Sequence, residues 1–241
     1  MEEWFLEYHI HKNRPGLLGD IASLLGMLSI NIVTIGGAEG INRILLRTDD
    51  TQKISILRSM LRTIENITVT ALRQPTLPDR LALRHGRFIR SESEHNKTYR
   101  FSRDELGILI DFLGELLKRE GNQVIGVKGM PKVGKTEAII AACVYSSKRW
   151  TFISSTMIRQ SARTRLYPVE REPDNIVFLL DGSMTARASE DHHRVVKEVM
   201  DMDVPKVIEN PDMFIQQGDY TLDIFDRIIE LYSTGETFTE G

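Results

Sequence analysis

Residues 124–144 read VIGVKGMPKVGKTEAIIAACV, and they contain three different local patterns. The apolar run at 124–127 is typical of a strand that is buried on both faces. Small apolar residues from 138 to 144 predict a helix, and a loop with two glycines joins the two elements. A strand, a glycine loop and a helix in this order predict an α/β fold for this part of the chain.

The loop has the spacing of a P-loop, with Gly129 followed after four residues by Gly134, Lys135 and Thr136. In such a loop backbone N–H groups and the start of the helix surround phosphates, where a Cβ atom would obstruct the approach. Lys135 would neutralise the β and γ phosphates, and the Thr136 hydroxyl would hold magnesium. We therefore predict nucleotide contacts from Gly129, Met130, Pro131, Lys132, Val133, Gly134, Lys135, Thr136 and Glu137.

A second apolar run, at 176–180, ends in Asp181 and resembles a Walker B strand, whose carboxylate reaches magnesium through water. The sequence thus predicts Lys135 and Asp181 as catalytic residues, with Thr136 and Asp181 at the metal. A turn or cap role for Asp181 stays open as the alternative. Asn210, after the apolar strand at 206–208, is a further candidate for contact with the γ phosphate.

Three absent patterns limit the activity that the sequence predicts. The sequence lacks an Asn-Lys-x-Asp string, the usual guanine-recognition motif of GTPases, so we expect ATP rather than GTP, with Mg²⁺. No glutamate follows Asp181 to orient water, and Val133 replaces the additional glycine of many small-molecule kinases. A slow ATPase and a small-molecule kinase both stay open, and nucleotide binding is better supported than turnover. Four arginines are available to stabilise transferred charge, namely Arg159, Arg163, Arg187 and Arg194.

The first 75 residues alternate strand and helix patterns. Period-two alternation predicts a strand at 4–10, and helical spacing predicts helices at 17–28 and 54–64. β-Branched or aliphatic runs predict strands at 30–35, 44–46 and 67–72, the first two forming a hairpin across the glycines at 36–40. The order is βαββαβ, the ferredoxin-like plan.

Over about the first 73 residues the chain resembles an ACT domain, a small-ligand-sensing module. The resemblance rests on the turn at 13–18, the helix after it, and an Ile-Asn-Ile strand start at 30–32. It implies a homodimer that binds a small effector, such as an amino acid, beside the turn. A purely structural role for Pro15 and Gly16 in that turn stays open. The implied effector residues are Asn13, Arg14, Pro15, Gly16, Leu17, Leu18 and Asn31.

We divide the chain into an ACT-like domain (1–75), a basic linker or arm (76–103) and a P-loop domain (104–241). The segment 73–103 has a charge of +5, whereas the rest of the chain carries −8. A solvated linker whose arginines pair with acidic neighbours is the first interpretation. The alternative is a non-enzymatic regulator that contacts nucleic acid or a partner protein near Arg80, Arg84, Arg87 and Arg90.

The last 138 residues predict further alternation of strands and helices, hence a mostly parallel sheet. We expect helices at 104–117 and 222–232, strands at 150–154, 176–180 and 206–208, and a helix around His192 and His193. Adjacent histidines point to different faces of a helix, so we interpret both as surface residues.

Composition points to a soluble cytoplasmic protein: 41% of the 241 residues are hydrophobic and 27% are charged. The amino terminus has no signal-peptide pattern, and no apolar run is long enough for membrane insertion. The single cysteine, Cys143, lies among apolar residues and reads as a small buried side chain.

Taken whole, the chain resembles the YmfK-type family of Gram-positive bacteria, through residues 81–87, 103–107 and 129–131. That family joins an ACT-like domain to a P-loop region. From the P-loop and the ACT-like domain together we expect a nucleotide-binding protein whose P-loop domain responds to a ligand of the ACT-like domain.

Overall fold

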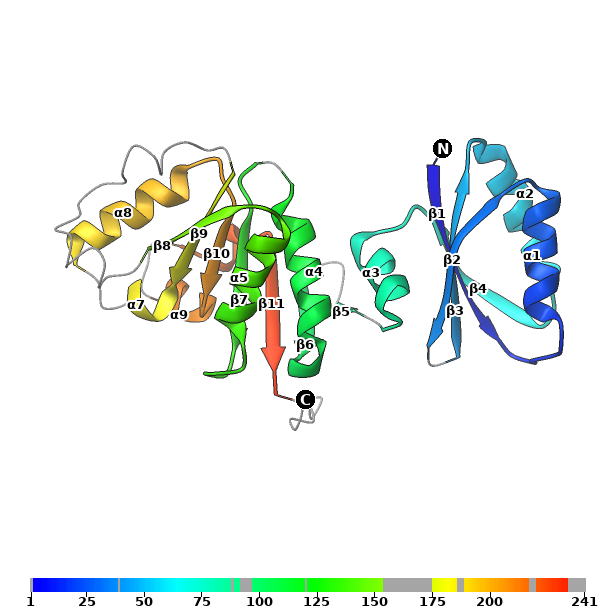
Figure 1. Ribbon diagram of the computed structural model, residues 1–241, viewed down its shortest axis with the longest axis horizontal. Coiled ribbons are helices and arrows are strands. Elements are labelled where there is room, and N and C mark those ends of the chain that lie inside the picture. Colours follow the sequence, from blue (N-terminus) through cyan, green and yellow to red (C-terminus); the bar gives the residue numbers. More distant parts are fainter. Residues whose placement is uncertain are drawn as a thin grey trace. The chain divides into compact units, whose positions relative to one another are not determined.

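The computed structural model (Figure 1) describes residues 2–38, 40–87, 89–91, 97–119, 121–153, 175–185, 189–216 and 220–233. The chain forms two compact units, residues 1–89 and residues 90–241. Each unit has its own sheet.

The first unit has the predicted βαββαβ order. Its four strands form an antiparallel sheet in the order β2-β3-β1-β4. The predicted hairpin of β2 and β3 is confirmed, with Ala38 opposite Ile41 at its closed end. The elements are β1 (Glu2–Ile10), α1 (Leu17–Met27), β2 (Asn31–Ala38), β3 (Ile41–Thr48), α2 (Thr51–Leu61) and β4 (Ile67–Arg73).

One face of this sheet carries the main core of the unit. Leu6 and Tyr8 of β1 are fully buried in it, and they pack with buried residues of both helices, such as Ile21 and Leu57. The alternation seen in the sequence of β1 therefore describes this face correctly.

The opposite face of the sheet contacts part of the segment 76–103, which the sequence analysis assigns to a basic linker or arm. Helix α3 (Leu77–His85) places Leu83 against Phe5 and Leu45. Proline and glycine suggest a loop here, but each has a helical role in this segment. Pro78 lies in the first turn, where a proline costs no hydrogen bond, and Gly86 is the left-handed cap with φ 66°.

The second unit is built on a seven-stranded sheet in the order β5-β6-β11-β7-β10-β9-β8. All neighbouring strands are parallel except β5 and β6, so the predicted mostly parallel sheet is confirmed. The strands are β5 (Arg90–Ser91), β6 (Thr98–Ser102), β7 (Val124–Gly129), β8 (Arg149–Ile153), β9 (Ile176–Asp181), β10 (Lys206–Glu209) and β11 (Arg227–Tyr232).

Figure 1 shows α4 and α5 side by side on one face of this sheet, where the two helices contact each other. Another part of the core joins α8 and α9 to β9 and β10, through residues such as Val195, Phe214 and Phe178. The helices are η1 (Arg103–Glu105), α4 (Leu106–Leu117), α5 (Lys135–Tyr145), α7 (Gly182–Thr185), α8 (Glu190–Asp201), α9 (Pro211–Gln216) and η3 (Leu222–Ile224).

Two sequence predictions for this unit are wrong. Residues 227–232, expected to continue a helix from 222, form β11 between β6 and β7. The spacing of the apolar residues fits either structure over so short a segment, and pairing with distant strands decides. His192 is fully buried because it begins the apolar stripe of α8 with Val195, Val196 and Val199, whereas His193 is exposed as expected.

The predicted burial of the single cysteine is confirmed. Cys143 is fully buried in α5, and burial raises the pKa of its thiol to about 12, which makes it unreactive. Among the described residues no helix is both long and apolar enough to cross a membrane.

Helices α4 and α5 approach each other at Gly114. A Cβ atom there would lie 2.3 Å from Cδ1 of Tyr145. The Tyr145 hydroxyl donates a 2.8 Å hydrogen bond to Glu115, and the Lys118 ammonium lies 4.3 Å from the centre of its ring. The tyrosine is thus fixed by two residues of α4 and by Lys118, which caps that helix.

We expect Gly114→Ala to lower the free energy of unfolding by about 1–3 kcal/mol, because the ring must move, although alanine is the better helix former. Gly107→Ala in the same helix is the matched control, since open space surrounds that position. It should be neutral or stabilising by up to about 1 kcal/mol. Urea unfolding of both variants measures this, and equal effects would contradict the packing argument.

Lys206 at the start of β10 is fully buried, and its ammonium donates to the Asn122 side chain and the Met202 carbonyl. Burial lowers the pKa of Lys206 from 10.5 to about 8, and Asp203 and Asp201 oppose this lowering. Between these two values the unfolded chain holds a proton that the folded chain has lost.

The contribution of Lys206 to stability should therefore rise with pH from about 8 to about 10.5, by up to about 3 kcal/mol. The measurement is urea unfolding of the unaltered protein and of Lys206→Met at pH 7 and pH 10, because other titrations cancel in the difference. Parallel pH profiles of the two proteins would show that the pKa of Lys206 is not lowered.

Candidate functional site

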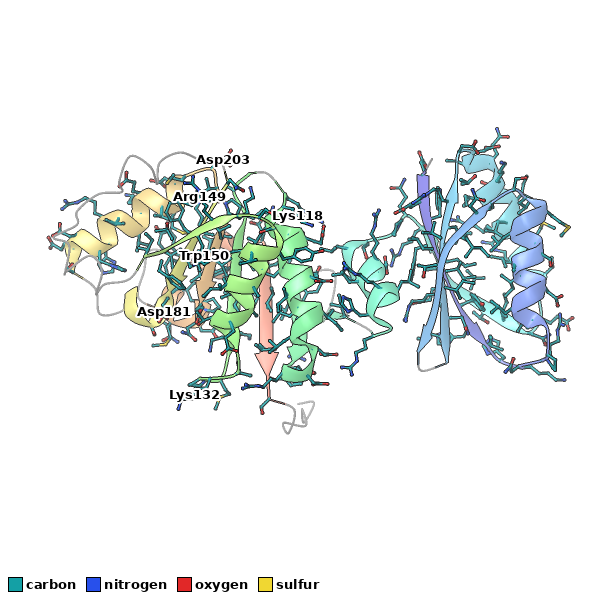
Figure 2. The ribbon with its side chains drawn as sticks, in the orientation of Figure 1. Lys118, Lys132, Arg149, Trp150, Asp181 and Asp203 are labelled. Atoms are coloured by element: carbon teal, nitrogen blue, oxygen red, sulfur yellow. The ribbon has the colours of Figure 1, made fainter. Side chains whose placement is uncertain are left out.

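The predicted loop lies at the carboxyl end of the parallel strands. After β7 the chain crosses β10 and β9 to reach β8, and after β10 it crosses β7 in the opposite direction to reach β11. In open α/β sheets ligands bind at such a reversal, outside the carboxyl ends of the strands. Figure 2 shows Lys132 and Asp181 at this end of the sheet and Lys118 and Asp203 at the other.

Both glycines of the loop are required by its backbone. Gly129 has φ 149° and Gly134 has φ 108°, conformations that L side chains rarely adopt. A Cβ atom on Gly129 would lie only 2.1 Å from the Leu231 carbonyl oxygen of β11. Lys132 also has a positive φ, 65°, and the Arg103 side chain donates a 2.8 Å hydrogen bond to its carbonyl.

Helix α5 begins directly after the loop. Gly134 is its amino-terminal cap, and the hydrogen bond from Ala138 N–H to the Gly134 carbonyl, 3.0 Å long, opens its backbone ladder. The N–H groups of residues 135–137 therefore precede the ladder, and the positive end of the helix dipole lies at the same place. This arrangement suits an anion.

The Lys135 side chain folds back over the loop. Its ammonium donates to the carbonyl oxygens of Gly129, at 2.6 Å, and Met130, at 3.1 Å, and the residue is only 8% exposed. The positive charge is therefore held against the loop backbone and not in bulk solvent.

The Thr136 hydroxyl donates a 2.6 Å hydrogen bond to Oε1 of Glu209. Glu209 is the last residue of β10, whereas the sequence indicated Asn210, one residue later. Burial raises the pKa of the Glu209 carboxyl, Asp181 adds to this, and the Thr136 hydrogen bond and Lys135 oppose it. No local pattern in the sequence indicates Glu209, because its position beside Thr136 follows from the pairing of β10 with β7.

A cavity of about 350 Å³ lies in front of these residues. This is within the usual range of small-molecule sites, roughly 300–1,000 Å³. Of the predicted loop residues, Val133 is buried in the protein and Met130 is exposed. The cavity is lined by Pro131, Lys132, Gly134, Lys135, Thr136, Glu137 and Glu209.

Asp181, the predicted Walker B acid, ends β9 and has a local role. One of its oxygens, Oδ1, accepts hydrogen bonds from the Ser183 N–H at 2.9 Å and the Ser183 hydroxyl at 2.8 Å. The Asn210 side chain donates to the same oxygen at 3.0 Å. Asp181 and Asn210 therefore bind each other, and neither is among the described residues that line the cavity.

Thr136 and Glu209 fit magnesium as a pair. Magnesium commonly uses one or two protein oxygens and takes the rest from phosphates and water. A metal site made by the protein alone is not found in the described ranges, where no group of three His, Cys, Asp or Glu residues could hold an ion. A magnesium ion here would therefore depend on a phosphate ligand.

Of the four arginines predicted for charge stabilisation, Arg194 lies in the described part of the chain. Arg159, Arg163 and Arg187 lie outside the described residues. Arg194 is on α8, where it is exposed and pairs with Asp191 at 3.4 Å.

In the first unit the predicted effector turn at 13–18 precedes α1. Gly16 caps that helix with φ 86°, Arg14 pairs with Asp20, and Leu17 is buried. Asn31 is exposed at the start of β2. The turn is formed as the sequence predicts, and effector binding stays a prediction.

In the basic segment two arginines are engaged with acids of the same unit. Arg73 pairs with Asp79 at 2.5 Å and Arg80 with Glu3 at 3.0 Å. These pairs agree with the first interpretation of the segment, and the nucleic-acid alternative stays a prediction.

Comparison with known proteins shows the family but no activity. A solved DAHP synthase of Thermotoga maritima covers 96% of this chain and 88% of its own at 11% identity, but its TM-score of 0.24 carries no argument about fold. The uncharacterized protein YmfK of Bacillus subtilis (strain 168) is 54% identical over 231 residues, which are 95% of this chain and 86% of YmfK. The family model described as protein of unknown function (DUF3388) matches residues 69–239. The chain therefore belongs to the DUF3388 family, together with relatives of the YmfK type.

Proposed function

We propose that the second unit binds ATP with magnesium at the loop 129–136. The observation that carries this proposal is the joint position of Lys135 and Thr136, which line one cavity of about 350 Å³ at the start of α5. A phosphate group there would meet the N–H groups of the helix start, a lysine and a hydroxyl.

Lys135 has the position that phosphate binding needs. Its ammonium is bound to two carbonyl oxygens of its own loop, and a phosphate would replace at least one of them with a charged acceptor. Because the Lys135 side chain is already largely buried, it loses little conformational entropy when the ligand binds. Magnesium, when bound, would neutralise part of the phosphate charge.

Binding is the core of this proposal, and turnover is a second step. A slow ATPase and a small-molecule kinase both use a P-loop, and both need a cation to stabilise the transferred charge. Among the described residues Arg103 is the arginine that contacts the loop, through the Lys132 carbonyl. We propose ATP over GTP because the guanine-reading string is absent from the sequence.

Replacement of Lys135 by alanine should weaken ATP binding at least about tenfold, or about 1.4 kcal/mol, because the charge facing the phosphates is lost. Isothermal titration calorimetry with ATP and GTP, each with and without magnesium, measures the effect on the intact protein.

Lys118→Ala is the matched control, since it removes the same charge at the opposite end of the sheet (Figure 2) and should leave ATP affinity unchanged. Thermal unfolding checks that both variants fold. Equal affinity of Lys135→Ala and the unaltered protein would show that Lys135 does not bind phosphate.

For the first unit we propose a sensing role in a cytoplasmic homodimer. The βαββαβ order and the antiparallel sheet β2-β3-β1-β4 support it, together with the turn that Gly16 forms before α1. A small effector, such as an amino acid, would bind at 13–18 and Asn31. It would act on the P-loop unit only through different affinities for two states of the protein.

An effector of this kind should change the affinity for ATP by about 5–150-fold, the usual range of allosteric coupling. ATP titrations in the presence of each amino acid would detect it, and ATP should change the affinity for the effector by the same factor. In Asn31→Ala the coupling should fall while ATP affinity alone stays the same. If no amino acid changes ATP affinity, amino-acid sensing is excluded.

A further inference from the structure

The acid that contacts the predicted magnesium residue is not the one that the sequence indicates. Thr136 supplies the hydroxyl of the proposed metal site, and that hydroxyl donates to Glu209 at 2.6 Å. Glu209 lines the same cavity as Lys135 and Thr136, whereas Asp181 is not among its described lining residues.

The sheet explains why Glu209 reaches this position. Strand β10 lies directly beside β7, with Glu209 opposite Val127, two residues before the loop begins. The Asn210 N–H donates to the Val127 carbonyl at 3.0 Å, so the end of β10 is held against the strand that carries the loop. Strand β9, which carries Asp181, is one strand further away.

Asp181 is held next to Glu209 but is turned to other partners. The two residues are opposite each other in the pairing of β9 with β10. Oδ1 of Asp181 accepts three hydrogen bonds, from the N–H and hydroxyl of Ser183 and from the side chain of Asn210. These contacts fix the turn after β9 and the side chain of Asn210. Asp181 therefore has a positioning role.

We propose that Glu209, and not Asp181, is the carboxylate that accompanies Thr136 at the magnesium ion of a bound ATP. The inference rests on the proposed function of the loop. A threonine hydroxyl has lone pairs for a metal and one proton for an acceptor, so Thr136 would keep its hydrogen bond to Glu209 while its oxygen faces the ion. The negative charge of Glu209 would then stabilise the ion and its bound water.

The same geometry predicts the opposite effect without magnesium. A carboxylate beside the phosphates repels them when no cation lies between, because like charges at short distance raise the free energy of the complex. Glu209 should therefore make ATP binding dependent on magnesium. Removal of its charge should weaken ATP binding with magnesium and should not weaken it without magnesium.

Two matched substitutions of a carboxylate by an amide distinguish the roles of Glu209 and Asp181. Glu209→Gln and Asp181→Asn each remove one charge, keep the shape of the side chain and keep an oxygen that accepts hydrogen bonds. Calorimetry would measure ATP affinity for both variants, first in EDTA and then with magnesium, and the ratio of the two affinities is the gain due to the metal.

We expect the gain in ATP affinity due to magnesium to be about tenfold smaller in Glu209→Gln than in the unaltered protein. In EDTA this variant should bind ATP at least as well as the unaltered protein. Asp181→Asn should keep the full gain. The electron paramagnetic resonance signal of free Mn²⁺ gives a second readout. In the presence of ATP, Glu209→Gln should bind less Mn²⁺ than Asp181→Asn. Thermal unfolding checks the fold, and Glu209→Asp, which keeps the charge, should keep more of the gain than Glu209→Gln.

The reverse pattern, with the gain lost in Asp181→Asn and kept in Glu209→Gln, would overturn the inference and return the metal to Asp181. A full gain in both variants would overturn it as well. In either case the proposed function would stand if Lys135→Ala still loses affinity in EDTA. Absence of ATP binding by the unaltered protein would remove both proposals.

Discussion

The parallel hydrogen bonding between β7 and β10 is the constraint on which the site depends. It places Glu209 opposite Val127 and lets the Asn210 N–H donate to the Val127 carbonyl. Because side chains alternate along a strand, a slip of one residue would turn Glu209 to the other face of the sheet and away from Thr136. Gly126 leaves room for the start of α9 beside this pairing, since a Cβ atom there would lie 3.1 Å from the Pro211 side chain.

Close backbone approach recurs around the site and explains its glycines. Gly129 lies so near the Leu231 carbonyl that a Cβ atom would overlap it, which holds the loop entrance against β11. A Cβ atom on Gly182 would lie 2.4 Å from the Asn210 carbonyl, so the end of β9 lies close against the start of α9. These contacts bring the end of β7 against β11 and the end of β9 against the end of β10 without long side chains. They also explain how Glu209 and Asp181, two carboxylates, are held beside each other although their charges repel.

The two units differ in how far their sequences reveal their structures. In the first unit the pattern of each element could be read locally, because strand alternation and helical spacing both point to one buried face. The core on the second face of the sheet was hidden, since Pro78 in the first turn of α3 and Gly86 at its end suggest a loop. In the second unit β6 and β11 were hidden, because β6 lies in the segment assigned to the linker and the apolar spacing of 227–232 also fits a helix. Both strands gain their stability from strands far away in the sequence. His192 was misplaced for a related reason, since its neighbours in α8 and not its own polarity determine its burial.

The sequence by itself determined the βαββαβ order of the first unit, the mostly parallel sheet of the second, and a strand, glycine loop and helix at 124–144. These features follow from local periodicity and from glycine conformations, which act within a few residues. Only the tertiary structure decided which acid lies beside Thr136. A strand end acquires its neighbours from the order of strands in the sheet, and that order depends on hydrogen bonds between β7 and β10, which are about 80 residues apart in the chain. Glu209 therefore joins Thr136 through the fold alone, and no spacing along the sequence indicates it.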